Sequence, residues 1–179
     1  MIPFSSLLIT TAYTRGKSQT VTTPCKTDSL KTFAVSGRVT QTYSYCGGAS
    51  PPKQVLDRLA NPVAYSGKKF YIRQGKANST KAKVVKSFTT GKDGEFSIRL
   101  TPGVYAVILE EQLNKIRPAD LAKENQQVDE QCLFQWWVKP YYLLVVKDKN
   151  IPHLNFTFHH RCFISSDIPC VNYIGPPVP

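Results

Sequence analysis

Apolar and polar side chains alternate along the middle of the chain with the period of two that predicts half-buried β-strands. In residues 95–100 every second side chain is apolar and the others are polar, and the alternation resumes in residues 105–109. The Asp93-Gly94 pair before the first run suits a turn that needs a positive φ. The Pro102-Gly103 pair between the runs suits a type II turn. These residues therefore predict a β-hairpin.

Weaker patterns outside this hairpin predict further short elements. Ser50 can act as an N-cap, and the apolar stripe that follows it predicts a short helix that ends at Asn61-Pro62. After residue 111, the pattern predicts helices at 118–123 and 129–138, and strands at 141–146 and 154–158.

The hairpin also carries a family resemblance. The stretches Thr89–Phe96 and Pro102–Val107 resemble the signature of carboxypeptidase regulatory-like domains, also described as transthyretin-like or prealbumin-like. The opening strand of such a domain would be Phe33–Val39, and a middle strand would be Lys69–Arg73. The resemblance implies a mainly β fold, a small Greek-key β-sandwich over about residues 31–110. It also implies an accessory or binding module of a secreted or periplasmic protein, without a cofactor.

Two segments depart from the family pattern. One is the insertion Cys46–Pro62, and the other is the extension after Glu111, and together they carry the predicted short helices. With 179 residues, of which 41% are hydrophobic, the chain is long enough to bury one sizeable core. We therefore expect residues 31–179 to form one β-sandwich domain, with any specific activity in the insertion and the extension.

The N-terminal residues differ in character from the rest. Ile2–Ile9 is apolar, and Thr10-Thr11-Ala12 offers the small residues that a signal peptidase requires, but no basic residue precedes the apolar run. We interpret residues 1–30 as a partial signal peptide followed by a polar linker. The alternative is an N-terminal tail without a fixed structure. No stretch of the sequence is long and apolar enough to span a bilayer as a helix.

Five cysteines bear on the compartment. Cys46, Cys132, Cys162 and Cys170 are expected to form two disulfides in an oxidising compartment, which leaves Cys25 over in the linker. The spacing leaves the connectivity open, and the alternative is that all five are reduced. Since no Cys-x-x-Cys pair occurs, a structural zinc site and a thioredoxin-like site are both disfavoured.

Histidines near the last predicted strand offer a metal-binding alternative. His159 and His160 lie close to Cys162, and copper or zinc accepts such ligands. A disulfide would remove the Cys162 thiolate from this set. The metal reading therefore depends on His159 and His160, and solvent-facing histidines at a strand end are the alternative.

A basic stretch suggests a second kind of surface. The formal net charge is +11, and Lys68, Lys69 and Arg73 begin a run of basic residues that continues to Lys92. Such a field can steer anionic glycans to the protein. Nucleic acid is disfavoured because no recognition motif for it occurs. The alternative is that lysines on edge strands keep those edges unpaired and soluble.

Neighbouring aromatic residues suggest a third surface. Trp136, Trp137 and Tyr141 surround Pro140, and adjacent tryptophans on one short helix cannot both point into the same core. An exposed ring would bind neutral glycans, whereas a buried one would attach the extension to the sandwich.

Enzymatic readings find little support in the residues. Nucleophile-elbow, phosphate-loop and zinc-protease motifs are all missing from the sequence, and only 12 residues are acidic. We also considered an isopeptide bond from Lys31 or Lys69 to Asn155 beside Glu110 or Glu111, as in related sandwich domains of surface adhesins, but the spacing does not match. The sequence thus predicts a non-enzymatic accessory or binding module of the cell envelope, whose partners would be envelope proteins or glycans. Metal binding and carbohydrate binding are the alternatives, and the oligomeric state stays open.

Overall fold

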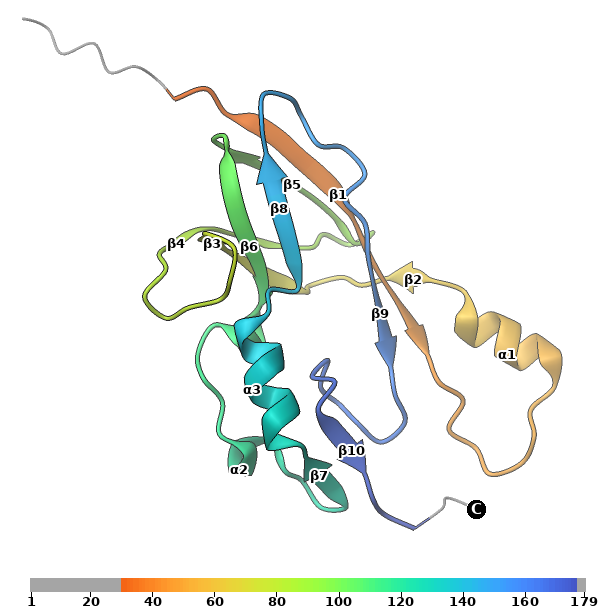
Figure 1. The fold of residues 1–179 in the computed structure, drawn as a ribbon. Coiled ribbons are helices and arrows are strands. Elements are labelled where there is room, and N and C mark those ends of the chain that lie inside the picture. Colours follow the sequence, from red (N-terminus) through yellow and green to blue (C-terminus); the bar gives the residue numbers. More distant parts are fainter. Residues whose placement is uncertain (1–29, 177–179) are drawn as a thin grey trace, which may run out of the picture.

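The computed structural model describes residues 30–176, and these form a mainly β structure (Figure 1). The predicted signal-peptide segment and Cys25 lie outside the described residues. Within residues 30–176, no helix has the length and apolar character that crossing a membrane requires.

The first sheet is built around the long strand β1 (Phe33–Tyr43). Its N-terminal half pairs antiparallel with β5 (Glu95–Leu100), and its C-terminal half pairs antiparallel with the short β2 (Val63–Ala64). The late strand β9 (Phe156–His160) runs parallel to β1, so the beginning and the end of the sandwich lie side by side.

The second sheet has four strands in the order β4-β3-β6-β8, all antiparallel to their neighbours. Their bounds are Val84–Thr89 for β4, Lys69–Gln74 for β3, Gly103–Leu109 for β6 and Tyr142–Val146 for β8. Side chains from the two sheets form the main core around Phe70, whose ring stacks on Phe88 and contacts Phe156 and Phe158. The predicted β-sandwich is therefore confirmed.

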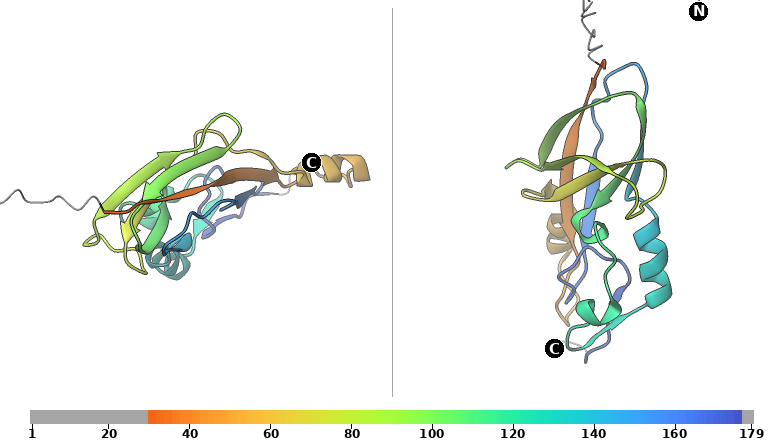
Figure 2. Two further views of the ribbon diagram at one scale, coloured as in Figure 1. Left: turned by 90° about the horizontal axis from the view of Figure 1, so that it is seen from above. Right: turned by 90° about the vertical axis from the view of Figure 1, so that its left-hand side faces the viewer.

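The insertion and the extension hold the remaining elements. Helix α1 (Lys53–Ala60) projects from the body of the molecule and buries none of its residues (Figures 1 and 2). The extension contains the elements η1 (Glu110–Gln112), α2 (Pro118–Leu121), β7 (Gln126–Val128), α3 (Glu130–Val138) and β10 (Val171–Tyr173). Strands β7 and β10 pair as a small antiparallel sheet.

The extension has a small apolar core of its own. Leu133 from α3 packs there with Ile164, Ile168 and Cys170 from the chain after β9. Trp136 contacts both this cluster and the main core. Trp136 of α3 therefore connects the apolar core of the sandwich to the apolar core of the extension.

Most predicted elements occur where the sequence placed them, but some local predictions are wrong. Gly94 has the positive φ, +74°, that the Asp-Gly turn required. Gly103 does not adopt a positive φ, so the turn before β6 is not type II. The predicted hairpin is also wrong, because β5 pairs with β1 and β6 pairs with β3 and β8, so the turn connects the two sheets. Ser50 does not cap α1, whose N-cap is Pro52 and lacks a side-chain hydrogen bond. The sequence pattern did not indicate β2, β4, β7 or β10, because β2, β7 and β10 are short and β4 alternates poorly.

Gly37 shows why the first strand carries a glycine. At this residue β1 passes the chain that leads into β9, and the Leu154 amide donates a hydrogen bond to the Ser36 carbonyl, 3.0 Å away. A Cβ atom at position 37 would overlap the Leu154 carbonyl group. The close parallel approach of these two segments therefore requires a residue without a side chain.

Candidate functional site

A cleft of about 320 Å³ lies where the extension meets the sandwich, beside β9. Trp136, Pro140, Tyr141 and Phe158 contribute its apolar lining. Tyr141 stacks on Phe158 with ring centroids 4.9 Å apart, so part of this lining is held rigidly by the core. A smaller pocket, about 200 Å³, lies beside Phe134 on α3. The larger cleft is the stronger candidate because it adjoins a buried cluster of charged groups.

Polar residues also contribute to the wall of the larger cleft, among them Lys139, His159 and Asp167. The His159 ring is fixed by two hydroxyl groups, with Nδ1 3.0 Å from the Thr42 Oγ1 and Nε2 2.9 Å from the Ser44 Oγ. The Lys139 residue is exposed. The cleft thus combines aromatic faces with an exposed cation, which suits a ligand that has an apolar ring and polar or anionic substituents.

The charged cluster is centred on Lys68, which precedes β3 and is 8% exposed. Its Nζ lies 2.7 Å from Oδ2 of Asp167 and 3.0 Å from Oε1 of Glu111. The Asp167 side chain is 5% exposed, and Asp167 lies in the loop between β9 and β10. We call Lys68, Glu111 and Asp167, together with Tyr65 and His160, the Lys68 cluster.

The two remaining members of the Lys68 cluster complete the surroundings of Asp167. The Tyr65 hydroxyl donates a hydrogen bond to Oδ2 of Asp167 at 2.9 Å, and His160 Nδ1 lies 3.7 Å from Oδ1. Burial, followed by the Asp167 carboxylate, raises the pKa of Tyr65. Tyr65 therefore stays protonated and acts as a hydrogen-bond donor over the physiological pH range.

One oxygen of the Lys68 cluster lacks a partner. Oε2 of Glu111 is buried and accepts no hydrogen bond from residues 30–176, although Oε1 of the same carboxylate contacts Lys68. Buried polar atoms usually have a partner. Glu111 thus has a free acceptor position next to the Lys68 ammonium.

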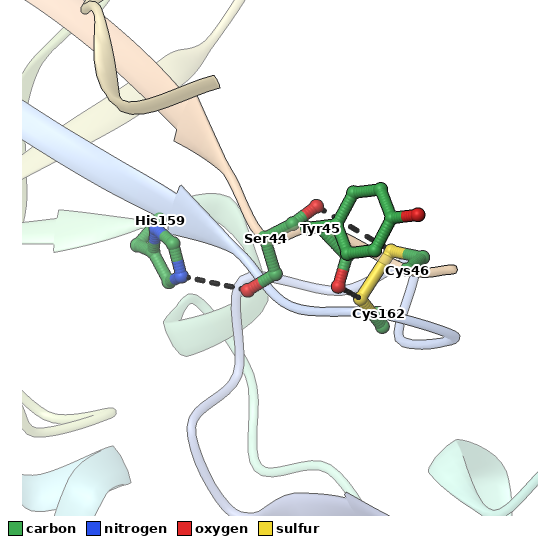
Figure 3. The surroundings of a disulfide bond; sticks show 5 residues. All are labelled: Ser44, Tyr45, Cys46, His159 and Cys162. Atoms are coloured by element: carbon green, nitrogen blue, oxygen red, sulfur yellow. Dashed lines mark hydrogen bonds between the residues drawn. A yellow bond between two sulfur atoms is a disulfide. The ribbon is translucent and has the colours of Figure 1, made fainter. Parts of the chain in front are cut away.

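Two disulfides cross-link the chain near the cleft, and they involve the four cysteines that the sequence predicted to pair. The structure supplies the connectivity that the sequence left open, with Cys46 bonded to Cys162 and Cys132 bonded to Cys170. The first disulfide joins the ends of β1 and β9, close to the hydrogen bond between Ser44 and His159 (Figure 3). The second joins α3 to the start of β10 inside the small core.

The two histidines of the metal alternative do not converge. They are consecutive on β9, so their side chains point to opposite faces of the sheet. His159 bonds to Thr42 and Ser44, whereas His160 bonds to Gln41 and stacks on Tyr43. Within residues 30–176, no group of three or more potential ligands is close enough to share an ion.

The predicted basic surface needs a correction. Lys68 is buried in its cluster, and Arg73 is 4% exposed and donates to the carbonyl groups of Ser79 and Leu113. Of these three residues, only Lys69 keeps a substantially exposed side chain, and its Nζ lies 3.5 Å from Glu110, whereas Lys76, Lys81, Lys83, Lys86 and Lys92 further along the run are exposed. Two of the three named residues are therefore structural, because each has buried acceptors that an alternating pattern does not reveal.

One of the two tryptophans is buried and helps to attach the extension to the sandwich, as the alternative to glycan binding required. Trp137 is buried, and its Nε1 donates to the Asn114 carbonyl at 2.9 Å. Trp136 is half-buried between the two apolar clusters, and one side of it reaches the cleft. The most exposed aromatic ring of α3 belongs instead to Phe134, which is 63% exposed.

The isopeptide arrangement considered from the sequence is not assembled. Asn155 accepts a hydrogen bond from the Arg38 amide at 3.0 Å, and Lys69 contacts Glu110 at the surface. The buried lysine next to two carboxylates is Lys68, one residue earlier.

A further set of residues that the sequence did not single out attaches α3 to the sandwich. The fully buried Gln112 side chain donates to the carbonyls of Trp136 and Lys139 at 2.8 and 2.7 Å, and accepts from the Leu109 amide at 3.1 Å. Asn78 donates to the carbonyl groups of Gln112 and Trp137, each at 2.8 Å. These bonds satisfy the last carbonyls of α3 and so position Trp136 at the cleft.

Tyr141 in the cleft should make the stability of the protein depend on pH in the alkaline range. Burial raises the pKa of Tyr141 from 10.0 to about 12, and the Asp167 carboxylate adds to the shift. The folded state then binds this proton more tightly than the unfolded state, so stability falls as pH rises from about 10 to 12. We expect the free energy of unfolding of Tyr141→Phe to decrease by about 2 kcal/mol less than that of the original protein between pH 10 and 12. Denaturant unfolding across that pH range measures the difference. An unchanged slope in the variant would contradict the assignment, and Tyr173→Phe is a matched control.

Comparisons with known proteins give no family assignment. No protein-family model matches the chain, and no curated protein matches it in sequence. Solved structures with some similarity include the Bacillus anthracis TIE protein, with 10% identity and a TM-score of 0.35, covering 72% of this chain and 17% of that one. The shaft pilin SpaA from Lactobacillus rhamnosus GG has 13% identity and a TM-score of 0.34, covering 73% of this chain and 49% of that one. The chain thus spans less than half the length of either protein.

A structure of the N-terminal domain of the same pilin is similar over more of its length. It has 13% identity and a TM-score of 0.35, and the match covers 76% of this chain and 98% of that domain. Because these TM-scores are all below 0.5, the fold assignment rests on the strand order and pairing of the chain itself.

Proposed function

We propose that this chain is an exported, non-enzymatic module that serves as an accessory or binding domain at the cell envelope. The observation that supports this most directly is the pair of disulfides. Disulfides persist in secreted and periplasmic proteins and are rare in reducing compartments. The first joins the insertion to the chain after β9, and the second joins two parts of the extension, both segments that the family pattern lacks.

The family resemblance is part of the same proposal. The consecutive strands β5 and β6, the positive φ of Gly94, and the strands β1 and β3 occur at the places that a carboxypeptidase regulatory-like domain would have them. We propose membership of that group, with the cleft and the Lys68 cluster as additions of this chain.

Export is tested in cells that make the protein, by fractionation followed by alkylation of free thiols and mass spectrometry. We expect the protein in the envelope or the medium, with Cys46, Cys132, Cys162 and Cys170 protected from alkylation until a reductant is added. Protein confined to the cytosol with these four thiols free would overturn the proposal.

Carbohydrate binding at the cleft is the second candidate function. Trp136, Tyr141 and Lys139 support it, because an aromatic face beside a cation accommodates a sugar ring with polar or acidic substituents. Titration of intrinsic tryptophan fluorescence with neutral and acidic oligosaccharides tests this candidate. A saturable change that Lys139→Ala weakens for acidic sugars alone would support it. No change with any sugar would remove it, without affecting the export proposal.

A further inference from the structure

A buried lysine lies in contact with a buried carboxylate in the Lys68 cluster. Lys68 Nζ is 2.7 Å from Oδ2 of Asp167, and the two side chains are 8% and 5% exposed. The rings of Tyr65 and Phe158 lie next to the same nitrogen, with centroids 5.7 and 5.4 Å from it. Carbon is attacked most readily when the reacting atoms are held about 3 to 3.5 Å apart and shielded from water. The contact between Nζ and Oδ2 places the nitrogen close to that range from the carboxyl carbon.

A second carboxylate completes the arrangement. Oε1 of Glu111 lies 3.0 Å from the same Nζ, and Oε2 is buried without a hydrogen-bond partner in the part of the chain that the structure describes. The cluster therefore holds a nucleophile, a carboxyl carbon and a proton acceptor in contact, with the side chains of Lys68, Asp167 and Glu111 8%, 5% and 29% exposed. An ion pair with a purely structural role would need only the lysine and the aspartate, and not the second carboxylate.

We propose that Lys68 and Asp167 form an intramolecular isopeptide bond. The Lys68 nitrogen attacks Cγ of Asp167, a C–N bond forms, and one C–O bond of the carboxyl group breaks. Of the three protons on the ammonium group, one stays on the amide nitrogen and two leave with the departing oxygen as water. The ammonium and carboxylate charges cancel, so the reaction needs no oxidant, cofactor or activated group.

The neighbouring side chains have defined parts in this reaction. Glu111 accepts a proton from Nζ and returns it to the departing oxygen, and its free Oε2 can hold the proton in between. Tyr65 donates to Oδ2 of Asp167 at 2.9 Å, which stabilises the negative charge that develops on this oxygen when nitrogen adds to Cγ. The departing oxygen is then Oδ1, on the side of His160.

The bond would change what holds the extension to the sandwich. Lys68 leads into β3, and Asp167 lies between Cys162 and Cys170, so the bond would join the second sheet to the loop that both disulfides flank. Buried ion pairs contribute little net stability, because desolvation offsets much of their attraction. A neutral amide in the same place removes that cost. This inference does not rest on the proposed function.

The test is the mass of the full chain after reduction, denaturation and digestion with trypsin. We expect the peptide that begins at Cys162 to be joined to the peptide containing Lys68, with a combined mass lower by one water molecule and no cleavage after Lys68. Lys68→Arg keeps the positive charge but should give two separate peptides of full mass. Separate, full-mass peptides in the unmodified protein would overturn the proposal.

The part assigned to Glu111 has its own variant. Glu111→Gln removes the proton acceptor with little change in shape, so we expect full-mass peptides from a protein that still forms both disulfides. Complete joining in this variant would overturn the role of Glu111. Asp167→Asn offers a second readout, because any bond formed there would release ammonia in place of water.

Discussion

Replacing Cys46 and Cys162 together by alanine is expected to lower the free energy of unfolding by about 4 to 5 kcal/mol. The disulfide joins residues that are 116 positions apart, so its loss frees a long loop in the unfolded chain. It also joins the ends of β1 and β9, and the Ser44 amide bonds to the His160 carbonyl next to it. Denaturant unfolding of the oxidised proteins measures the difference.

Reducing conditions provide the control for this prediction. When the Cys132–Cys170 disulfide is also reduced in both proteins, the double variant and the original chain should unfold at nearly the same denaturant concentration. A difference that persists after reduction would assign the loss to side-chain packing and not to the cross-link. The oxidised variant should also show stronger proteolysis near α1, since the insertion is then attached only through its flanking strands.

Gln112→Glu is expected to destabilise the protein by about 3 kcal/mol or more at pH 7. The new carboxyl group has nearly the same shape, but an oxygen would replace the amide nitrogen that donates to Trp136 and Lys139. That oxygen would face two partly buried carbonyl groups. Burial favours the protonated form, so the folded variant binds a proton more tightly than the unfolded one, and its stability should rise as pH falls from 7 toward about 4.

Gln127→Glu on β7 is the matched control for this change. Gln127 is exposed, so we expect a change within about 0.5 kcal/mol. Unfolding of both variants at pH 7 and pH 5 separates the two effects. A small loss at position 112 that does not depend on pH would contradict the role given to Gln112 in attaching α3. Because Trp136 belongs to α3, its fluorescence in the native state should also change in Gln112→Glu.

Local patterns in the sequence were enough for most of the sandwich. Strands β1, β3, β5 and β6 follow from alternation and turn residues, since a strand with one buried face must place an apolar side chain at every second position. The helices α1, α2 and α3 also occur within a few residues of their predicted ranges. Short paired strands such as β7 and β10 were not predicted, because each forms only by pairing with a segment that is distant in the sequence.

The candidate site was predictable only in part. The sequence indicated Trp136, Tyr141 and the four disulfide cysteines, since aromatic residues and cysteines can be chosen as candidates from their residue type alone. It assigned Lys68 and Arg73 to a basic surface, because nothing local distinguishes a buried lysine from an exposed one. It considered Glu111 only beside a different lysine, Lys31 or Lys69, and nothing in the sequence singled out Asp167 or Gln112.

The sequence by itself determined that this chain is a β-sandwich and that four of its cysteines pair, because periodicity, turn chemistry and residue type act over short distances. The tertiary structure alone decided which cysteines bond and which charges are buried. Lys68, Glu111 and Asp167 meet only because β9 returns to lie parallel to β1, which brings the segment after it back to the start of β3. Contacts across 43 and 99 positions are set by packing of the whole chain and not by any local pattern.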